Sequence, residues 1–81
     1  MLTLVAGVDI GNNSTEVALA EVDLQGGVRF LATALVPTTG IKGTQENSVG
    51  VLMGVQDALR MAGRRMSDLK RIYLNEATPV I

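Results

Sequence analysis

Residues 7–15 read GVDIGNNST and place one carboxylate, two amides and two hydroxyls within nine positions. A simple hairpin requires only a turn, for which Asn-Gly or Asp-Gly is sufficient. So many hydrogen-bonding groups around the turn glycine, Gly11, indicate a binding loop. Backbone N–H groups combined with amide and hydroxyl donors suit anionic oxygens, and phosphate is the natural ligand.

Asp9 does not fit a site for a bare anion, because its carboxylate would repel phosphate. A hydrated Mg²⁺ between the two resolves the conflict, since Mg²⁺ keeps several waters while it bridges carboxylate and phosphate oxygens. We therefore expect Asp9 to contact Mg²⁺ through water. The residues expected to bind the nucleotide phosphates are Gly11, Asn12, Asn13, Ser14 and Thr15. The Walker and dinucleotide-binding patterns are absent, and a hairpin whose polar residues simply face water is the alternative.

Three strands are predicted around and after this loop. Thr3–Asp9 is apolar on both faces, which is typical of a strand buried between two layers. Thr15–Val22 follows as a strand that pairs back on the first one. A Gly-Gly turn then leads into Val28–Pro37, which ends at its proline because proline cannot donate to a ladder.

A helix is predicted from about Gln45, with Thr44 as its N-cap and Gly63 at C′. Its expected buried stripe consists of Ser48, Leu52, Val55, Leu59 and Ala62. Gly50 and Gly54 are either points of close contact with the sheet or two tolerated weak positions. The arginines expected to form a solvated helix end are Arg60, Arg64 and Arg65.

Arg71–Asn75 is predicted as a fourth strand, which makes the order β-β-β-α-β. A right-handed crossover lays this strand parallel to the first one. The fold class is therefore α/β, with a mixed sheet and one crossover helix. The carboxyl ends of the first and fourth strands then share one edge with the 7–15 loop, and ligands collect at such ends in open α/β sheets.

Composition excludes several classes of site. The 81 residues contain no Cys and no His, which rules out disulfides and the usual zinc sites. A formal net charge of −1, from 7 basic and 8 acidic residues, gives no reason to expect nucleic acid or an anionic membrane. The apolar run 1–10 is too short to cross a bilayer and lacks a basic region, so we expect a cytoplasmic protein. The apolar ending NEATPVI favours a fragment of a longer chain.

The pattern D-x-G-x-x-[ST], placed between the first two strands, resembles the first phosphate loop of the actin-like (ribonuclease H-like) ATPases, which include Hsp70 and sugar kinases. Three stretches narrow this resemblance: VAGVDIGNNSTEVALA (5–20), TTGIKGT (38–44) and NEATPVI (75–81). In this order they resemble the start of the large subunit of diol/glycerol dehydratase reactivating factor. The resemblance implies that residues 1–81 are the N-terminal portion of an actin-like ATPase domain.

The same resemblance implies an activity, cofactors and partners. The factor would be a chaperone-like ATPase that releases damaged cobalamin from an adenosylcobalamin-dependent diol or glycerol dehydratase, with ATP hydrolysis resetting it. ATP or ADP with Mg²⁺ would be its cofactors, and a small subunit and the dehydratase its partners. Asp9 and residues 11–15 match the family's phosphate loop.

Two residues outside the loop, and two further functions, stay open. Lys42 could reach an anion or a partner, or belong to a turn that leads into the helix. Glu76, at the end of the fourth strand, could act as a catalytic residue that orients Mg²⁺-bound water, or simply be solvated. A small-molecule kinase of the same fold and a non-hydrolysing binding or structural module are the alternatives. An ATPase of this fold also needs a second phosphate loop and an adenosine pocket, and neither is present here.

Overall fold

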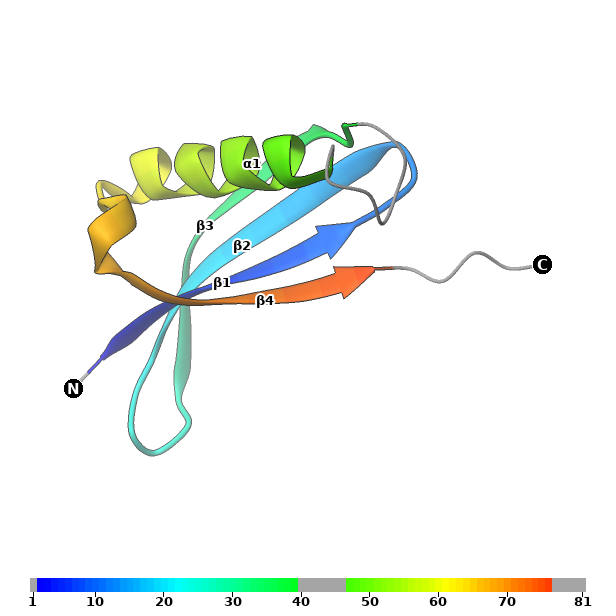
Figure 1. The fold of residues 1–81 in the computed structure, drawn as a ribbon. Helices are drawn as coiled ribbons and strands as arrows, with labels where there is room; N and C mark the ends of the chain where they lie inside the picture. Colours follow the sequence, from blue (N-terminus) through cyan, green and yellow to red (C-terminus); the bar gives the residue numbers. More distant parts are fainter. Residues whose placement is uncertain (1, 40–46, 77–81) are drawn as a thin grey trace.

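Figure 1 shows a twisted sheet with the helix α1 lying across one of its faces. The computed structural model describes residues 2–39 and 47–76, with the side chains at positions 47 and 76 excepted. Its elements are β1 (Thr3–Ile10), β2 (Ser14–Val22), β3 (Val28–Pro37), α1 (Asn47–Ala62), a 3₁₀ turn η1 (Met66–Asp68) and β4 (Leu69–Glu76). In the described ranges, no helix is both long and apolar enough to cross a membrane.

The four strands are ordered β3-β2-β1-β4. β1, β2 and β3 form an antiparallel meander, and the chain returns through α1 to place β4 parallel to β1. The predicted α/β class, a mixed sheet with one crossover helix, is therefore confirmed. Because β1 and β4 run in the same direction, Ile10 and Glu76 pair at one edge of the sheet, where the β1–β2 loop also lies.

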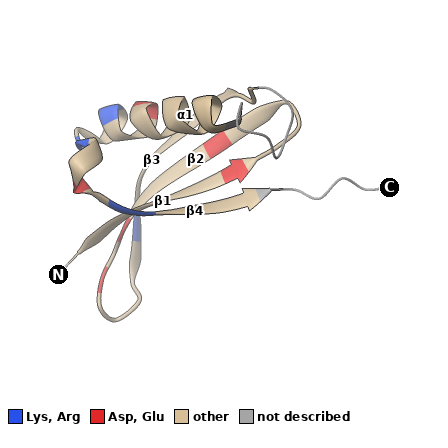
Figure 2. Cartoon of the chain, in the orientation of Figure 1, with Lys and Arg blue, Asp and Glu red and all other residues tan. Residues whose placement is uncertain are grey.

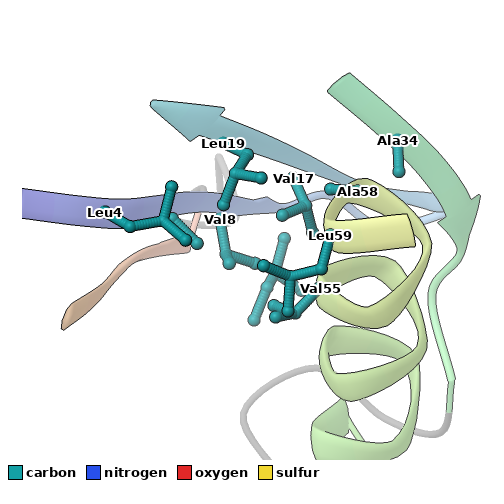
Figure 3. Packing of buried hydrophobic residues seen from close by; sticks show 10 residues of the cluster. Leu4, Val8, Val17, Leu19, Ala34, Val55, Ala58 and Leu59 are labelled. Carbon is teal, nitrogen blue, oxygen red and sulfur yellow. The ribbon is translucent and has the colours of Figure 1, made fainter. Parts of the chain in front are cut away.

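An aliphatic core fills the space between α1 and one face of the sheet. Figure 3 shows the side chains that converge there, among them Leu4, Val8, Val17, Leu19, Ala34, Val55, Ala58 and Leu59. Among the described residues, no second layer covers the other face, where Val5 and Gly7 are half-buried. The expectation that the first strand lies between two layers is thus met on one face only.

Two glycines bring α1 close to the sheet. A Cβ added at Gly54 would lie 2.7 Å from Val17 Cγ2 on β2, and one at Gly50 would lie 3.2 Å from the carbonyl oxygen of Pro37, the last residue of β3. The sequence left two interpretations of these glycines, and the structure identifies both as contact points. The predicted stripe is wrong at two positions: Ser48 is exposed, and Leu52 is 51% exposed. Residues 50 and 54 turn toward the sheet because they lack side chains, and position 52 therefore faces outward.

The C-terminal end of α1 matches the prediction. Gly63 has a φ of 68°, and its N–H donates to the Arg60 carbonyl at 3.1 Å. The N–H of Arg64 donates to the Leu59 carbonyl at 2.9 Å, which completes a Schellman motif. At the other end the helix begins at Asn47, and the predicted N-cap Thr44 lies outside the described residues.

Arg64 corrects the prediction of a fully solvated arginine cluster. Its Nη2 donates to Oε2 of Glu21 at 2.9 Å, and the Glu21 side chain is 9% exposed. Glu21 lies on the face of β2 that α1 covers, so its carboxylate requires a partner there. Arg60 and Arg65 retain side-chain exposures of 77% and 83% and agree with the prediction.

Candidate functional site

The β1–β2 connection is a tight turn closed by its own backbone. The N–H of Gly11 donates to the Ser14 carbonyl at 2.9 Å, which leaves Asn12 and Asn13 at the tip. A Cβ at Gly11 would lie 2.9 Å from that same carbonyl oxygen, so the hairpin itself requires glycine here. Asn12, Asn13 and Ser14 are exposed. Three of the predicted phosphate-binding residues therefore present their side chains at the surface.

Thr15 has a different environment. It is 1% exposed and lies on the face of β2 that α1 covers. Its Oγ1 is 3.0 Å from Oγ1 of Thr38, and the Thr38 hydroxyl donates to the Gly11 carbonyl at 2.8 Å. Because a hydroxyl has one hydrogen, Thr15 must be the donor to Thr38. The buried Thr15 side chain therefore supports the loop from behind.

Thr38 also supports the loop, although in the sequence it belongs to the separate stretch TTGIKGT (38–44). Its backbone N–H also donates to the Asn13 carbonyl at 3.0 Å. The signal that could have revealed it is strand register, because Ser14 pairs with Pro37 in the β2–β3 ladder. The residue after Pro37 must then lie beside the turn.

Asp9 lies near the carboxyl end of β1 and is exposed on the face away from α1. In the register it pairs with Glu16 on β2 and with Asn75 on β4. Like charges directly opposite each other destabilise a sheet unless a cation screens them. Glu16 is thus a second acidic residue that sequence reasoning missed, although the short hairpin determines its position opposite Asp9.

An open hollow of about 280 Å³ lies beside this acidic pair. Its lining consists of Gly7, Val8, Asp9, Glu16, Ala18, Tyr73, Leu74 and Asn75. Gly7 pairs with Ala18 on one side and Tyr73 on the other, so two small residues leave space between the tyrosine and the carboxylates. The hollow is therefore apolar beneath and acidic at its end near the loop.

Charge is unevenly distributed over the sheet. In Figure 2 two acidic segments lie side by side on β1 and β2, whereas basic segments gather at the far end of α1 and at the start of β4. Within the described ranges, neither Asp9 nor Glu16 makes an ion pair. The same ranges hold no group of three metal-binding side chains. The two carboxylates of Asp9 and Glu16 suit Mg²⁺, which takes one or two carboxylates and completes its shell with water and ligand oxygens.

Glu76 is the last residue of β4 and pairs with Ile10, which places its backbone at the same edge as the loop. Its side chain lies outside the described part of the structure, so its predicted catalytic role stays a prediction. Lys42 and the rest of residues 40–44 also lie outside the described ranges.

The chain is similar to the large subunits of dehydratase-reactivating factors. It is 51% identical over 77 residues to the propanediol dehydratase-reactivating factor large subunit of Citrobacter freundii. It is also 51% identical to the diol dehydratase-reactivating factor large subunit of Klebsiella michiganensis, and 48% identical to the propanediol dehydratase counterpart of Salmonella typhimurium. Each match covers 95% of this chain, and the chain spans 13% of the length of these curated relatives. No protein-family model matches the chain.

The chain is also similar to solved structures of dehydratase-reactivating factors. A nucleotide-free form of diol dehydratase-reactivating factor superposes with a TM-score of 0.85 at 48% identity, over 95% of this chain and 13% of that one. A glycerol dehydratase reactivase superposes with a TM-score of 0.81 at 50% identity, over 94% of this chain and 12% of that one. The resemblance stated from the three sequence stretches is confirmed, and so is the fold.

Proposed function

We propose that residues 1–81 supply the first phosphate-binding loop of an ATP-dependent reactivating factor for adenosylcobalamin-dependent diol or glycerol dehydratase. The main support for this proposal is the 51% identity over 77 residues to large subunits of such factors. In this proposal the complete factor works in the cytoplasm with a small subunit and releases damaged cobalamin from the inactivated dehydratase. ATP hydrolysis then resets the factor.

The loop geometry supports phosphate as the ligand. Asn12, Asn13 and Ser14 are exposed at the tip, while Gly11 and the buried Thr15 keep the hairpin tight. Amide, hydroxyl and backbone N–H donors at one turn form a suitable cradle for phosphate oxygens. One solved relative is described as nucleotide-free, so nucleotide is the ligand to test first.

The acidic pair supports Mg²⁺ as the companion of that nucleotide. Asp9 and Glu16 pair across β1 and β2 and make no ion pair in the described ranges, so a bare phosphate would be repelled beside them. A bound Mg²⁺ would supply positive charge between these carboxylates and the phosphates. Asp9 would hold the ion through water. Glu76, whose strand ends at the same edge, is the residue we propose to orient the attacking water.

A coupled reactivation assay tests this function. The full-length large subunit, its small subunit, ATP and Mg²⁺ are added to a glycerol-inactivated dehydratase, and the recovery of dehydratase activity is followed. Asp9→Asn removes the charge that holds the hydrated metal and should lower the rate of recovery about 10–100-fold. Asp57→Asn is the matched control, because Asp57 lies on α1 with its side chain 43% exposed and forms its ion pair with Arg60 on the same helix.

The outcomes separate the parts of the proposal. No recovery with the unmodified protein would refute the reactivation role. Recovery that does not depend on ATP would refute the nucleotide role, and equal rates for Asp9→Asn and Asp57→Asn would refute the metal role. Phosphorylation of a sugar by the unmodified protein would favour the kinase alternative instead.

A further inference from the structure

Thr38 makes three hydrogen bonds to the hairpin that carries the proposed phosphate site. Its hydroxyl donates to the Gly11 carbonyl at 2.8 Å and lies 3.0 Å from the hydroxyl of Thr15. Its backbone N–H donates to the Asn13 carbonyl at 3.0 Å. Thr38, the first residue after β3, therefore hydrogen-bonds to two carbonyl groups of the turn and to the buried Thr15 side chain behind it.

These bonds fix the direction of two N–H groups that Thr38 does not touch. In a trans peptide the carbonyl and the N–H of the same unit point in opposite directions. The Gly11 carbonyl turns toward Thr38, so the N–H of Asn12 turns away from it. The Asn13 carbonyl also turns toward Thr38, so the N–H of Ser14 turns away as well. Backbone donors held in this way can meet an anion without reorganising.

We propose that Thr38 is the positioning residue of the loop: it orients the N–H groups of Asn12 and Ser14 toward bound phosphate. The neighbouring Thr39 accepts a hydrogen bond from the N–H of Gly50 at 3.0 Å, so the segment is also anchored to the first turn of α1. The inference rests on the proposed function, because it assigns a role within that same site.

A pair of substitutions isolates the hydroxyl of Thr38 in the full-length protein. Thr38→Val keeps the branched shape and the backbone N–H but removes the bonds to Gly11 and Thr15, whereas Thr38→Ser keeps a hydroxyl. Thr33→Val makes the same chemical change at an exposed position of β3. We expect the Kd for ATP with Mg²⁺ to rise about tenfold in Thr38→Val and to stay within about twofold in the other two. Amide hydrogen exchange across residues 11–15, measured without nucleotide, should accelerate in Thr38→Val alone.

The two measurements fail separately. If the unmodified protein binds ATP and Thr38→Val binds it equally well, the positioning role is overturned and the proposed function stands. If Thr38→Ser loses as much affinity as Thr38→Val, the hydroxyl is not responsible and the inference is also overturned. If the unmodified protein binds no ATP, the proposed function is refuted. In that case amide hydrogen exchange still tests the positioning role. Equal exchange rates across residues 11–15 in Thr38→Val and Thr38→Ser would overturn it as well.

Discussion

Single hydrogen atoms in place of side chains determine how closely parts of this molecule approach. At Gly11 the limiting contact is the Ser14 carbonyl oxygen, 2.9 Å from where a Cβ would lie. At Gly54 it is Cγ2 of Val17, at 2.7 Å. The first glycine closes the proposed binding turn, and the second sets the distance between α1 and the strand that follows the turn.

Gly54→Ala should destabilise the protein although alanine favours helices. The helix propensity gain is about 1 kcal/mol, and overpacking against a buried side chain costs about 1–3 kcal/mol. We expect a net loss of up to about 2 kcal/mol in the free energy of unfolding, measured by urea denaturation. The Gly54→Ala, Val17→Ala double variant should lose less unfolding free energy than the sum of the losses of the two single variants. The reason is that alanine at position 17 makes room for the new methyl group at position 54. Strict additivity of the two losses would contradict the contact.

At the scale of elements, β2 connects the two ends of the domain. Its first residues form the turn with Gly11, and Glu21 near its other end binds Arg64 just beyond α1. The helix is therefore joined to β2 both by the core and by an ion pair that is largely shielded on the glutamate side. Movement of α1 relative to β2 is therefore restricted by packing at Val17 and by the ion pair near the end of the strand.

Arg64→Ala should be more destabilising than Arg60→Ala. The first change leaves a carboxylate with 9% side-chain exposure without its partner, and we expect a loss of about 1–3 kcal/mol, moderated because the Arg64 side chain is 36% exposed. Arg60 pairs with Asp57 within one helix turn at the surface, and its loss should cost less than about 0.5 kcal/mol. Thermal unfolding of the two variants provides the comparison, and equal midpoints would show that the Glu21 pair contributes no more than a surface pair.

Local sequence patterns are sufficient to predict the strands and the helix but not the contacts between these elements. Alternation and turn glycines predicted the three-stranded meander, and Gly63 predicted the helix end, since these signals depend on nearby residues. Leu52 was placed in the core because periodicity does not reveal that a glycine face packs closer than a leucine face. Thr38 and Glu16 were missed because their roles arise from register between strands rather than from their own neighbours in sequence.

At the scale of the whole molecule, the two faces of the sheet differ. α1 covers one face, while the other carries the hollow and exposes Phe30, Leu35 and Tyr73 by 72%, 67% and 56%. The chain also spans 13% of the length of its curated relatives. Within the described residues, α1 covers one face of the sheet, and the loop proposed to bind nucleotide lies at one edge of it.

Residues 1–81 alone should therefore bind ATP weakly and hydrolyse none. Under the proposed function, an ATPase of this fold also needs a second phosphate loop and an adenosine pocket, which would have to come from other segments. Phosphate release by the purified 81-residue chain, compared with the full-length protein at equal concentration, measures this. Turnover by the short chain above the rate of a blank without protein would contradict this expectation.

Gly7 offers a position at which a fluorescent probe can be attached beside the hollow. An added Cβ there would find no heavy atom within 4 Å, and the 81 residues contain no native thiol. A cysteine at position 7 could thus carry an environment-sensitive dye on the same face as Asp9, two positions away along β1. Its emission would report the arrival and departure of a ligand in real time, independently of any catalytic readout.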